Sequence, residues 1–162
     1  MRFVRSALVL AVIVLLTYGC GPKSVSPVQF GSPAASDRVL IATEDSEFKN
    51  AILDDVVEAF FGQDVFIQVT DLQSLENIRP EDYRAIVLIN TCIAWKVEPE
   101  IAAFLKKVNE PERVLVLTTT GDPDLTILAP DVDSVTSASQ MEKVDQVSRK
   151  IIDKVARVLA MK

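Results

Sequence analysis

The 162-residue sequence contains no histidine. This absence excludes Ser/His/Asp and Cys/His nucleophilic machinery, because both use an imidazole as the general base. It also removes the commonest nitrogen ligand of zinc sites. We therefore assign no catalytic residue and no metal ligand, and we expect a binding protein rather than an enzyme.

Basic residues are scarce as well. The chain has 17 lysines and arginines against 23 aspartates and glutamates, a formal charge of −6. Removal of an N-terminal leader that carries Arg2 and Arg5 would take two positive charges away and leave −8. Such an acidic balance argues against a nucleic-acid partner and against polybasic docking on anionic lipid.

The apolar run Ala7–Leu16 has ten residues, short of the about 20 that span a bilayer as a helix. It follows Arg2 and Arg5 and has the length of a signal-peptide hydrophobic region. The run is therefore expected to export the chain from the cytoplasm and not to anchor it as a transmembrane helix. An ordinary secretory signal or a short buried helix is the alternative.

The step from Gly19 to Cys20 resembles the lipobox of bacterial lipoproteins, although Thr17 stands where that family prefers leucine. The resemblance implies that residues 1–19 are a signal peptide cut off before Cys20. It also implies that the Cys20 thiol is acylated and anchors the protein to a bacterial membrane. Cys92 is then the single remaining cysteine, so no intramolecular disulfide is expected.

Residues 20–37 are rich in proline, glycine and serine, which predicts a flexible tether behind the lipidated cysteine. The folded domain is expected over residues 38–162. There, short β-rich runs alternate with helical patterns. The expected strands lie at 39–42, 65–69, 85–89, 114–118 and 133–136, and the expected helices begin near Ser46, Leu72, Pro99 and Ser139.

This βαβ rhythm predicts an α/β fold: a five-stranded parallel doubly wound sheet in the order 2-1-3-4-5, with helices on both faces. Gln68 interrupts the second apolar run and predicts an edge strand there. Ser139 and Glu142 have the spacing of a capping box for the last helix.

Three stretches resemble the flavodoxin-like domain: DYRAIVLINT at 82–91, EIAAFLKKV at 100–108 and RVLVLTTTG at 113–121. The resemblance implies a ligand crevice beyond the carboxyl ends of the strands, between loops 43–47 and 90–97. It also implies that Trp95 lies where flavodoxins place an aromatic side chain on the flavin ring.

Flavodoxins hold the FMN phosphate in a first loop rich in threonine, serine and glycine. Here the loop keeps the hydroxyls of Thr43 and Ser46, but it lacks glycine and carries Glu44, Asp45 and Glu47. These carboxylates would repel a phosphate dianion. In the alternative interpretation they only decorate the N-terminus of a helix, where negative charge is favourable.

A receiver domain has the same strand order and supplies a second comparison. Glu44 and Asp45 mimic its acidic pair, but Asn90 stands where its phosphorylated aspartate would be, and an amide cannot accept a phosphoryl group. A divalent cation on the two carboxylates is an open alternative.

Residues 133–139 resemble the motif D-x-x-[ST]-G-A-[ST], at which extracytoplasmic proteins receive FMN covalently on the last hydroxyl. Asp133, Thr136, Ala138 and Ser139 match, and Ser137 replaces the glycine. The alternative is a strand end followed by a helix cap.

Together these observations predict a lipid-anchored, extracytoplasmic flavodoxin-like domain that binds a small ligand or a protein partner and holds no cofactor. The expected binding rim consists of Thr43, Glu44, Asp45, Ser46, Asn90, Thr91, Trp95, Thr119, Thr120 and Gly121. The alternative is an FMN-containing electron carrier, with the flavin in the crevice or on Ser139.

Overall fold

A computed structural model describes residues 23–161 of the chain. The predicted signal peptide and the predicted lipidation site Cys20 lie outside the described residues. Within them, no helix is both long enough and apolar enough to cross a membrane.

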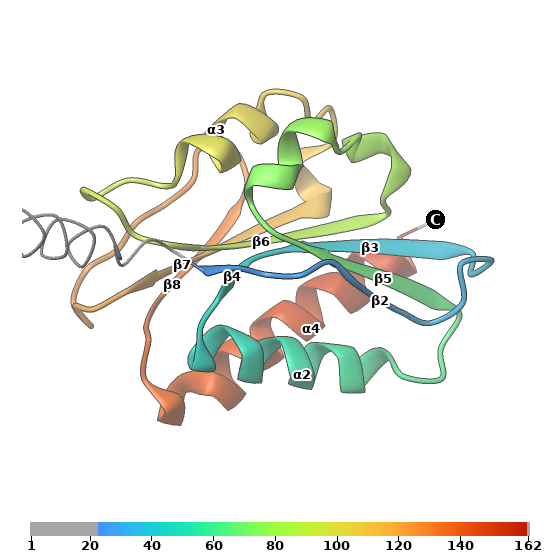
Figure 1. The fold of residues 1–162 in the computed structure, drawn as a ribbon, viewed down its shortest axis with the longest axis horizontal. Coiled ribbons are helices and arrows are strands. Elements are labelled where there is room, and N and C mark those ends of the chain that lie inside the picture. The colour runs from blue at the N-terminus through green and yellow to red at the C-terminus, as the bar shows by residue number, and fades with distance from the viewer. Residues whose placement is uncertain (1–22, 162) are drawn as a thin grey trace, which may run out of the picture.

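One six-stranded sheet forms the centre of the fold, in the order β2-β5-β3-β6-β7-β8 (Figure 1). Its five parallel strands are β3 (Asp37–Ala42), β5 (Val65–Thr70), β6 (Ala85–Thr91), β7 (Val114–Thr120) and β8 (Asp133–Ala138). Their spatial order confirms the predicted doubly wound arrangement. The runs in β3, β6 and β7 are almost wholly apolar because helices or turns cover both faces of these strands.

The sixth strand, β2 (Val28–Phe30), pairs antiparallel with β5. β5 is therefore an interior strand, and the edge position inferred from Gln68 is wrong. Gln68 is instead half-buried, and its side-chain oxygen accepts a hydrogen bond from the Tyr83 hydroxyl at 2.9 Å. A polar side chain in an interior strand is tolerated here because it has this partner.

The segment assigned to a flexible tether is ordered from Lys23 onward. β1 (Lys23–Ser24) pairs antiparallel with β4 (Glu44–Asp45), and β2 follows four residues later. The structured chain therefore begins well before the expected boundary at Arg38. β1 and β2 are ordered although they are short, because their backbone groups pair with strands that the rest of the fold already positions.

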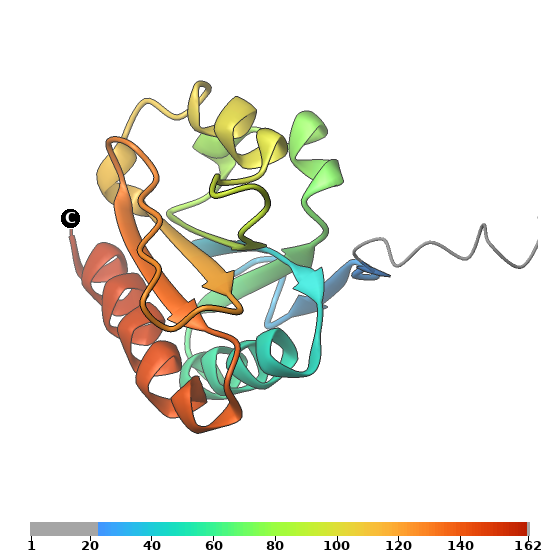
Figure 2. The ribbon, with the colours of Figure 1, turned by 90° about the vertical axis from the view of Figure 1, so that its left-hand side faces the viewer.

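Two long helices cover one face of the sheet: α2 (Glu47–Phe60) and α4 (Val144–Ala160) (Figure 2). Their apolar stripes pack on alternate side chains of the strands, including Val39, Ile41 and Val87. α2 begins near Ser46, as predicted, and Ser46 caps it by accepting a hydrogen bond from the Lys49 N–H at 3.2 Å. α4, in contrast, begins five residues after Ser139, so the predicted capping box is wrong.

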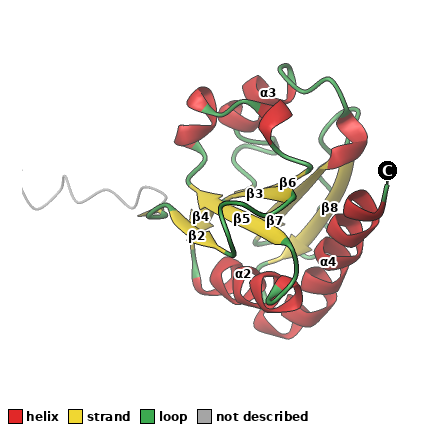
Figure 3. Cartoon of the chain, turned by 90° about the vertical axis from the view of Figure 1, so that its right-hand side faces the viewer, coloured by secondary structure: helices red, strands yellow, loops and turns green. Residues whose placement is uncertain are grey.

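The opposite face is covered by α3 (Pro99–Leu105), by the 3₁₀ helix Gln73–Asn77 and by connecting turns (Figure 3). Phe104, Ile101 and Leu75 pack there against Leu40 and Leu88. α3 ends at Leu105, and tighter turns follow in which the Lys107 N–H donates to the Phe104 carbonyl and the Val108 N–H donates to the Leu105 carbonyl. Residues 121–132 form a loop between β7 and β8.

Candidate functional site

The carboxyl ends of the parallel strands define one rim of the molecule. Loop 43–46 leaves β3 at this rim, and residues 92–98 leave β6 beside it. The chain after β7 starts at Gly121 on the same rim. The fold therefore brings the three predicted loops to one end, although the side chains within them differ in accessibility.

Asn90 is fully buried below the rim, where its side chain is satisfied by neighbouring strands. Its amide nitrogen donates to the Thr91 carbonyl at 3.1 Å, and its amide oxygen accepts from the Thr118 hydroxyl at 3.1 Å. The Thr119 hydroxyl donates to the Asn90 carbonyl. Thr120 is buried too, and its hydroxyl donates to the Asp122 carbonyl. These predicted rim residues therefore stabilise the strand ends, and their side-chain polar groups are already hydrogen-bonded within the protein.

Glu44 is buried beneath the rim, and its carboxylate is engaged by neighbouring elements. It is 6 % exposed and forms an ion pair with Lys49, which is 2 % exposed. The same carboxylate oxygen accepts hydrogen bonds from the Thr91 N–H at 2.9 Å and from the Thr91 hydroxyl at 2.8 Å. The Lys49 ammonium also donates to that hydroxyl at 2.8 Å. Three elements (β4, α2 and β6) are thus joined by one buried polar cluster.

Glu98 adds a second carboxyl to this cluster. It precedes α3, is 7 % exposed and makes no capping hydrogen bond. Burial, then the hydrogen bond and charge of Glu44 and the charge of Glu100, raise the pKa of Glu98 to about 7. Burial also acts to raise the pKa of Glu44, but the bonds and charge of Lys49 and the Thr91 bond outweigh it and hold that pKa below its ordinary value. At neutral pH Glu44 is therefore ionised, whereas Glu98 is close to half-protonated.

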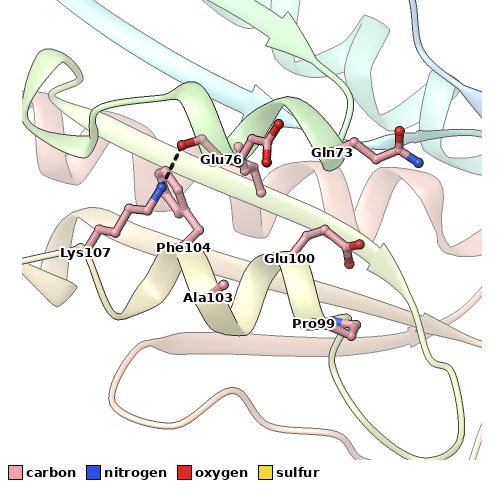
Figure 4. Close-up of a pocket in the computed structure, with 8 residues that line it drawn as sticks. Gln73, Glu76, Pro99, Glu100, Ala103, Phe104 and Lys107 are labelled. Atoms are coloured by element: carbon pink, nitrogen blue, oxygen red, sulfur yellow. Dashed lines mark hydrogen bonds between the residues drawn. The ribbon is translucent and has the colours of Figure 1, made fainter.

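A small cavity of about 100 Å³ opens onto this cluster, and we name it the acidic pocket. It is lined by Ser24, Thr43, Glu44, Asp71, Leu72, Gln73, Glu98 and Glu100. A wider groove of about 530 Å³ runs between the 3₁₀ helix 73–77 and α3 (Figure 4). Gln73 and Glu100 line both, so the groove adjoins the acidic pocket.

Lys49 and Glu98 were missed at the sequence level. Lys49 carried a signal, because it stands three residues before Ile52 and seven before Val56 on the apolar stripe of α2. A lysine on that stripe needs a buried partner. Glu98 carried none, since it lies before Pro99 in a polar loop whose path only the tertiary fold determines.

Loop 43–46 does not fit an FMN phosphate, the cofactor group that flavodoxins bind there. β4 is extended and pairs with β1, so its backbone does not curl into a ring of N–H donors. The Thr43 hydroxyl donates to the Glu44 carbonyl, and the Ser46 hydroxyl caps α2. Of the three predicted carboxylates, Glu44 is buried and neutralised by Lys49. The exposed pair Asp45 and Glu47 keeps the charge at this helix end negative.

Trp95 projects from the rim and does not form a lid over the core. Its side chain is 71 % exposed, and neighbouring Ile93 is 52 % exposed. Ile93 and Lys96 exchange backbone hydrogen bonds around a tight turn in which Ala94 and Trp95 have φ of 49° and 65°. Such left-handed geometry is unfavourable for residues other than glycine, by roughly 1 kcal/mol each. We refer to residues 93–96 as the tryptophan turn.

The predicted covalent-flavin motif lies along β8 and just beyond it. The Thr136 hydroxyl exchanges hydrogen bonds with the backbone of Ile127, and Asp133 pairs with Lys154 of α4. Ser139 is exposed, and its N–H continues the ladder by donating to the Thr120 carbonyl at 3.0 Å. Its hydroxyl does not cap α4, so it lacks the structural role that the alternative interpretation gave it.

No family model matches the sequence, and neither does any curated protein sequence. Among solved structures, a flavodoxin from the domain Archaea matches with a TM-score of 0.50 at 12 % identity, covering 75 % of this chain and 98 % of the flavodoxin. An oxidoreductase from Corynebacterium diphtheriae matches with a TM-score of 0.51 at 9 % identity, over 77 % of this chain and 96 % of that one.

The flavodiiron core from Synechocystis matches with a TM-score of 0.54 at 10 % identity. The match covers 80 % of this chain but 38 % of that core, so the chain spans well under half of its length. At such identities the likeness shows the fold alone. The protein therefore has a flavodoxin-like fold, and its own residues must decide what the rim binds.

Proposed function

We propose that this chain is a lipid-anchored extracytoplasmic protein whose flavodoxin-like domain binds a small molecule or a protein partner at the carboxyl-end rim, without an FMN phosphate site. The single observation that carries the proposal is that the polar groups of loop 43–46 are already bonded within the protein. The backbone of the loop pairs with β1, the hydroxyls of Thr43 and Ser46 are hydrogen-bonded, and Glu44 forms an ion pair with Lys49.

The experiment that tests the absence of a phosphate site compares FMN with riboflavin on the full chain in detergent. A phosphate site would make FMN the tighter ligand, since riboflavin differs from it by the lack of a phosphate. We expect both to bind equally weakly, with dissociation constants no lower than tens of micromolar, or about 6 kcal/mol. Nanomolar FMN binding, measured by quenching of flavin fluorescence, would establish the electron-carrier alternative instead.

The anchoring is tested with the two cysteines of the chain. Cys20→Ser should abolish acylation and release the protein from the membrane fraction. Cys92→Ser is the matched control and should leave acylation and membrane fractionation unchanged, because Cys92 lies half-buried at the end of β6. Intact masses without an acyl increment, or equal membrane fractionation of both variants, would contradict the lipoprotein assignment.

A second candidate function is a carrier with FMN attached covalently to Ser139. The observation in its favour is that Ser139 is exposed and is free of the capping role. Protein from its native host would then show a flavin visible spectrum and an FMN mass increment, both lost in Ser139→Ala and kept in Ser137→Ala. A colourless wild-type protein without that increment eliminates this candidate.

A further inference from the structure

Glu44 and Glu98 are two buried carboxyl groups in contact with each other. Both residues are more than nine-tenths buried, and they share a hydrogen bond. Glu44 is the ionised member, because the Lys49 ammonium and two groups of Thr91 bond to its Oε2 atom. A second buried carboxyl beside an ionised one is strongly disfavoured from ionising, since like charges repel in such a place. The pair therefore holds one proton, and that proton belongs to Glu98.

The free oxygens of the two carboxyl groups agree with this assignment. Oε1 of Glu44 and Oε1 of Glu98 are inaccessible, and neither has an N–H or O–H partner among the described residues. A proton on Glu98 makes its carboxyl a donor to Glu44, so one carboxyl–carboxylate bond satisfies both groups. Loss of the proton removes this bond and leaves two negative charges together in a buried place.

The bond attaches residues 92–98, which connect β6 to α3, to the rest of the rim. Among residues 23–161, the other polar contacts of this segment come from its backbone, such as the Cys92 N–H, which donates to the Thr119 carbonyl at 2.8 Å. Val97 is half-buried against the core, whereas the side chains of the tryptophan turn are exposed. Glu98 therefore supplies the one side-chain hydrogen bond that holds the described segment in place.

The tryptophan turn lies directly before Glu98 and is strained. Ala94 and Trp95 both have positive φ. Residues other than glycine keep such geometry only where surrounding contacts impose it. The segment is therefore expected to leave this conformation once the Glu98 carboxyl is detached.

We propose that the hydrogen bond between Glu98 and Glu44 is a pH switch, which holds residues 92–98 on the rim while Glu98 is protonated and releases them when Glu98 ionises. This deepens the proposed function by naming a regulation of the same rim, and its effect on binding rests on that function. Trp95 moves with the segment, so the shape of the rim depends on pH.

The groups around Glu98 determine the pH range of the switch. Burial, followed by the bond and charge of Glu44 and the charge of Glu100 in α3, raises the pKa of Glu98 to about 7. The charge of Lys49 in α2 acts in the opposite direction, and Asp71, which follows β5, lines the same pocket. In the released segment this pKa returns to its ordinary 4.5, so release sets a proton free. Release therefore becomes more frequent as pH rises from about 5 to about 7 and levels off near pH 8.

The test is hydrogen–deuterium exchange of the full chain in detergent between pH 5 and pH 8, with rates corrected for the intrinsic pH dependence of exchange. We expect the protection of the amides in residues 92–98 to fall about tenfold or more across this range. The amides of α2 in the same protein should keep their protection, because a local release does not open that helix.

Two variants separate the switch from other titrating groups. Glu98→Gln should keep residues 92–98 protected at every pH, because its carboxamide still donates to Glu44 and does not titrate. Glu112→Gln, an exposed control outside the pocket, should keep the wild-type profile.

Protection of residues 92–98 that does not change with pH would overturn the proposal. An equal loss in α2 would also overturn it, because that result indicates destabilisation of the whole fold. A folded Glu98→Gln variant that keeps the wild-type pH dependence has the same consequence. Should this variant fail to fold by circular dichroism, the comparison of residues 92–98 with α2 in the wild type decides alone. None of these outcomes depends on a ligand, on flavin or on Cys20, so this proposal and the proposed function fail separately.

Discussion

Lys49 is the side chain on which the buried cluster depends most. It lies on the apolar stripe of α2, is almost inaccessible to solvent, and donates to Glu44 and Thr91. Lys49→Met keeps a similar length but leaves the Glu44 carboxylate buried without its cation. Loss of one partner of a buried ion pair costs about 3–5 kcal/mol. We therefore expect the free energy of unfolding, measured by urea denaturation at pH 7, to decrease by about that amount.

The control for this substitution is Lys150→Met, on the exposed side of α4. Exposed substitutions away from special contacts change stability by about 0.5 kcal/mol or less. Equal losses in the two variants would show that the Lys49–Glu44 pair contributes nothing of its own.

Glu98 makes stability depend on pH in an unusual direction. Its pKa is about 7 in the folded protein against an ordinary 4.5, so between these values the folded state binds more protons than the unfolded state. Stability must therefore fall as pH rises from about 5 to about 8, by about 1.4 kcal/mol for each unit of pKa difference. The lowered pKa of Glu44 acts in the opposite sense, but its contribution is lost only as pH falls below the ordinary carboxyl range.

The measurement is a series of denaturant melts between pH 5 and pH 8. The sequence has no histidine, which would otherwise titrate in this window. Glu98→Gln should flatten the profile, whereas Glu112→Gln should keep the wild-type slope. A wild-type profile that is already flat would mean that Glu98 is ionised throughout.

At the scale of single elements, the position of β2 depends on Gly31. This glycine has a φ of +82°, and a Cβ built on it would lie 2.2 Å from the Val65 carbonyl oxygen. Gly31→Ala therefore meets backbone strain and a clash with backbone that cannot move aside cheaply. We expect a loss of about 2–4 kcal/mol in denaturant melts.

Gly62 provides the matched comparison, because its φ is +78° but a Cβ there would meet nothing within 4 Å. Gly62→Ala should cost about 1 kcal/mol through strain alone. If the two variants lose the same stability, the close approach of Gly31 to β5 contributes nothing, and the placement of β2 is in error.

The central strands carry the largest packing energies. Ile41 in β3 and Leu88 in β6 lie on opposite faces of the sheet and are almost fully buried. Truncation of either to alanine should cost about 2–5 kcal/mol through lost burial and cavity formation. Gln68→Ala should cost about 1 kcal/mol, the value of its bond to Tyr83. Comparable losses at all three positions would contradict this account of the sheet.

The parallel strands could be predicted from the sequence because strands covered on both faces are continuous apolar runs, as in Ala85–Ile89. β2 could not, since its three residues lie among proline, serine and glycine and gain their strand character only from pairing with β5. The start of α4 was misjudged at Ser139 for a similar reason, because the Ser139 N–H bonds to the Thr120 carbonyl of β7, a contact that only the tertiary fold supplies.

The candidate site, like the fold, could be predicted from the sequence only in part. Strand order alone was enough to predict that loops 43–47 and 90–97 meet at one rim. The burial of Glu44 could not be foreseen, because it depends on Lys49 and Thr91, which lie 5 and 47 residues further along the chain. A buried ion pair of this kind is a product of tertiary packing, and local patterns do not encode it.

At the scale of the whole molecule, the position of β1 relates the rim to the proposed anchor. β1 pairs with β4 at the end of the sheet where the parallel strands finish, which is also the end that carries the loop after β6 (Figure 1). Lys23 follows Cys20 by three residues, a reach of about 10 Å when fully extended. The proposed acyl anchor on Cys20 would therefore hold the rim, and not the opposite end, near the bilayer.

The tryptophan turn offers a direct measurement of this orientation, because Trp95 is the single tryptophan of the chain. Its exposed ring lies next to exposed Ile93, and an amphipathic ring of this kind prefers the boundary between headgroups and water. We expect the acylated full chain in lipid vesicles to show blue-shifted emission that brominated lipids quench. Cys20→Ser, added to the same vesicles, should keep the red-shifted emission of a hydrated tryptophan. Identical unquenched spectra from an acylated wild type and this variant would place the rim away from the membrane, with the tryptophan turn free to contact a partner in solution.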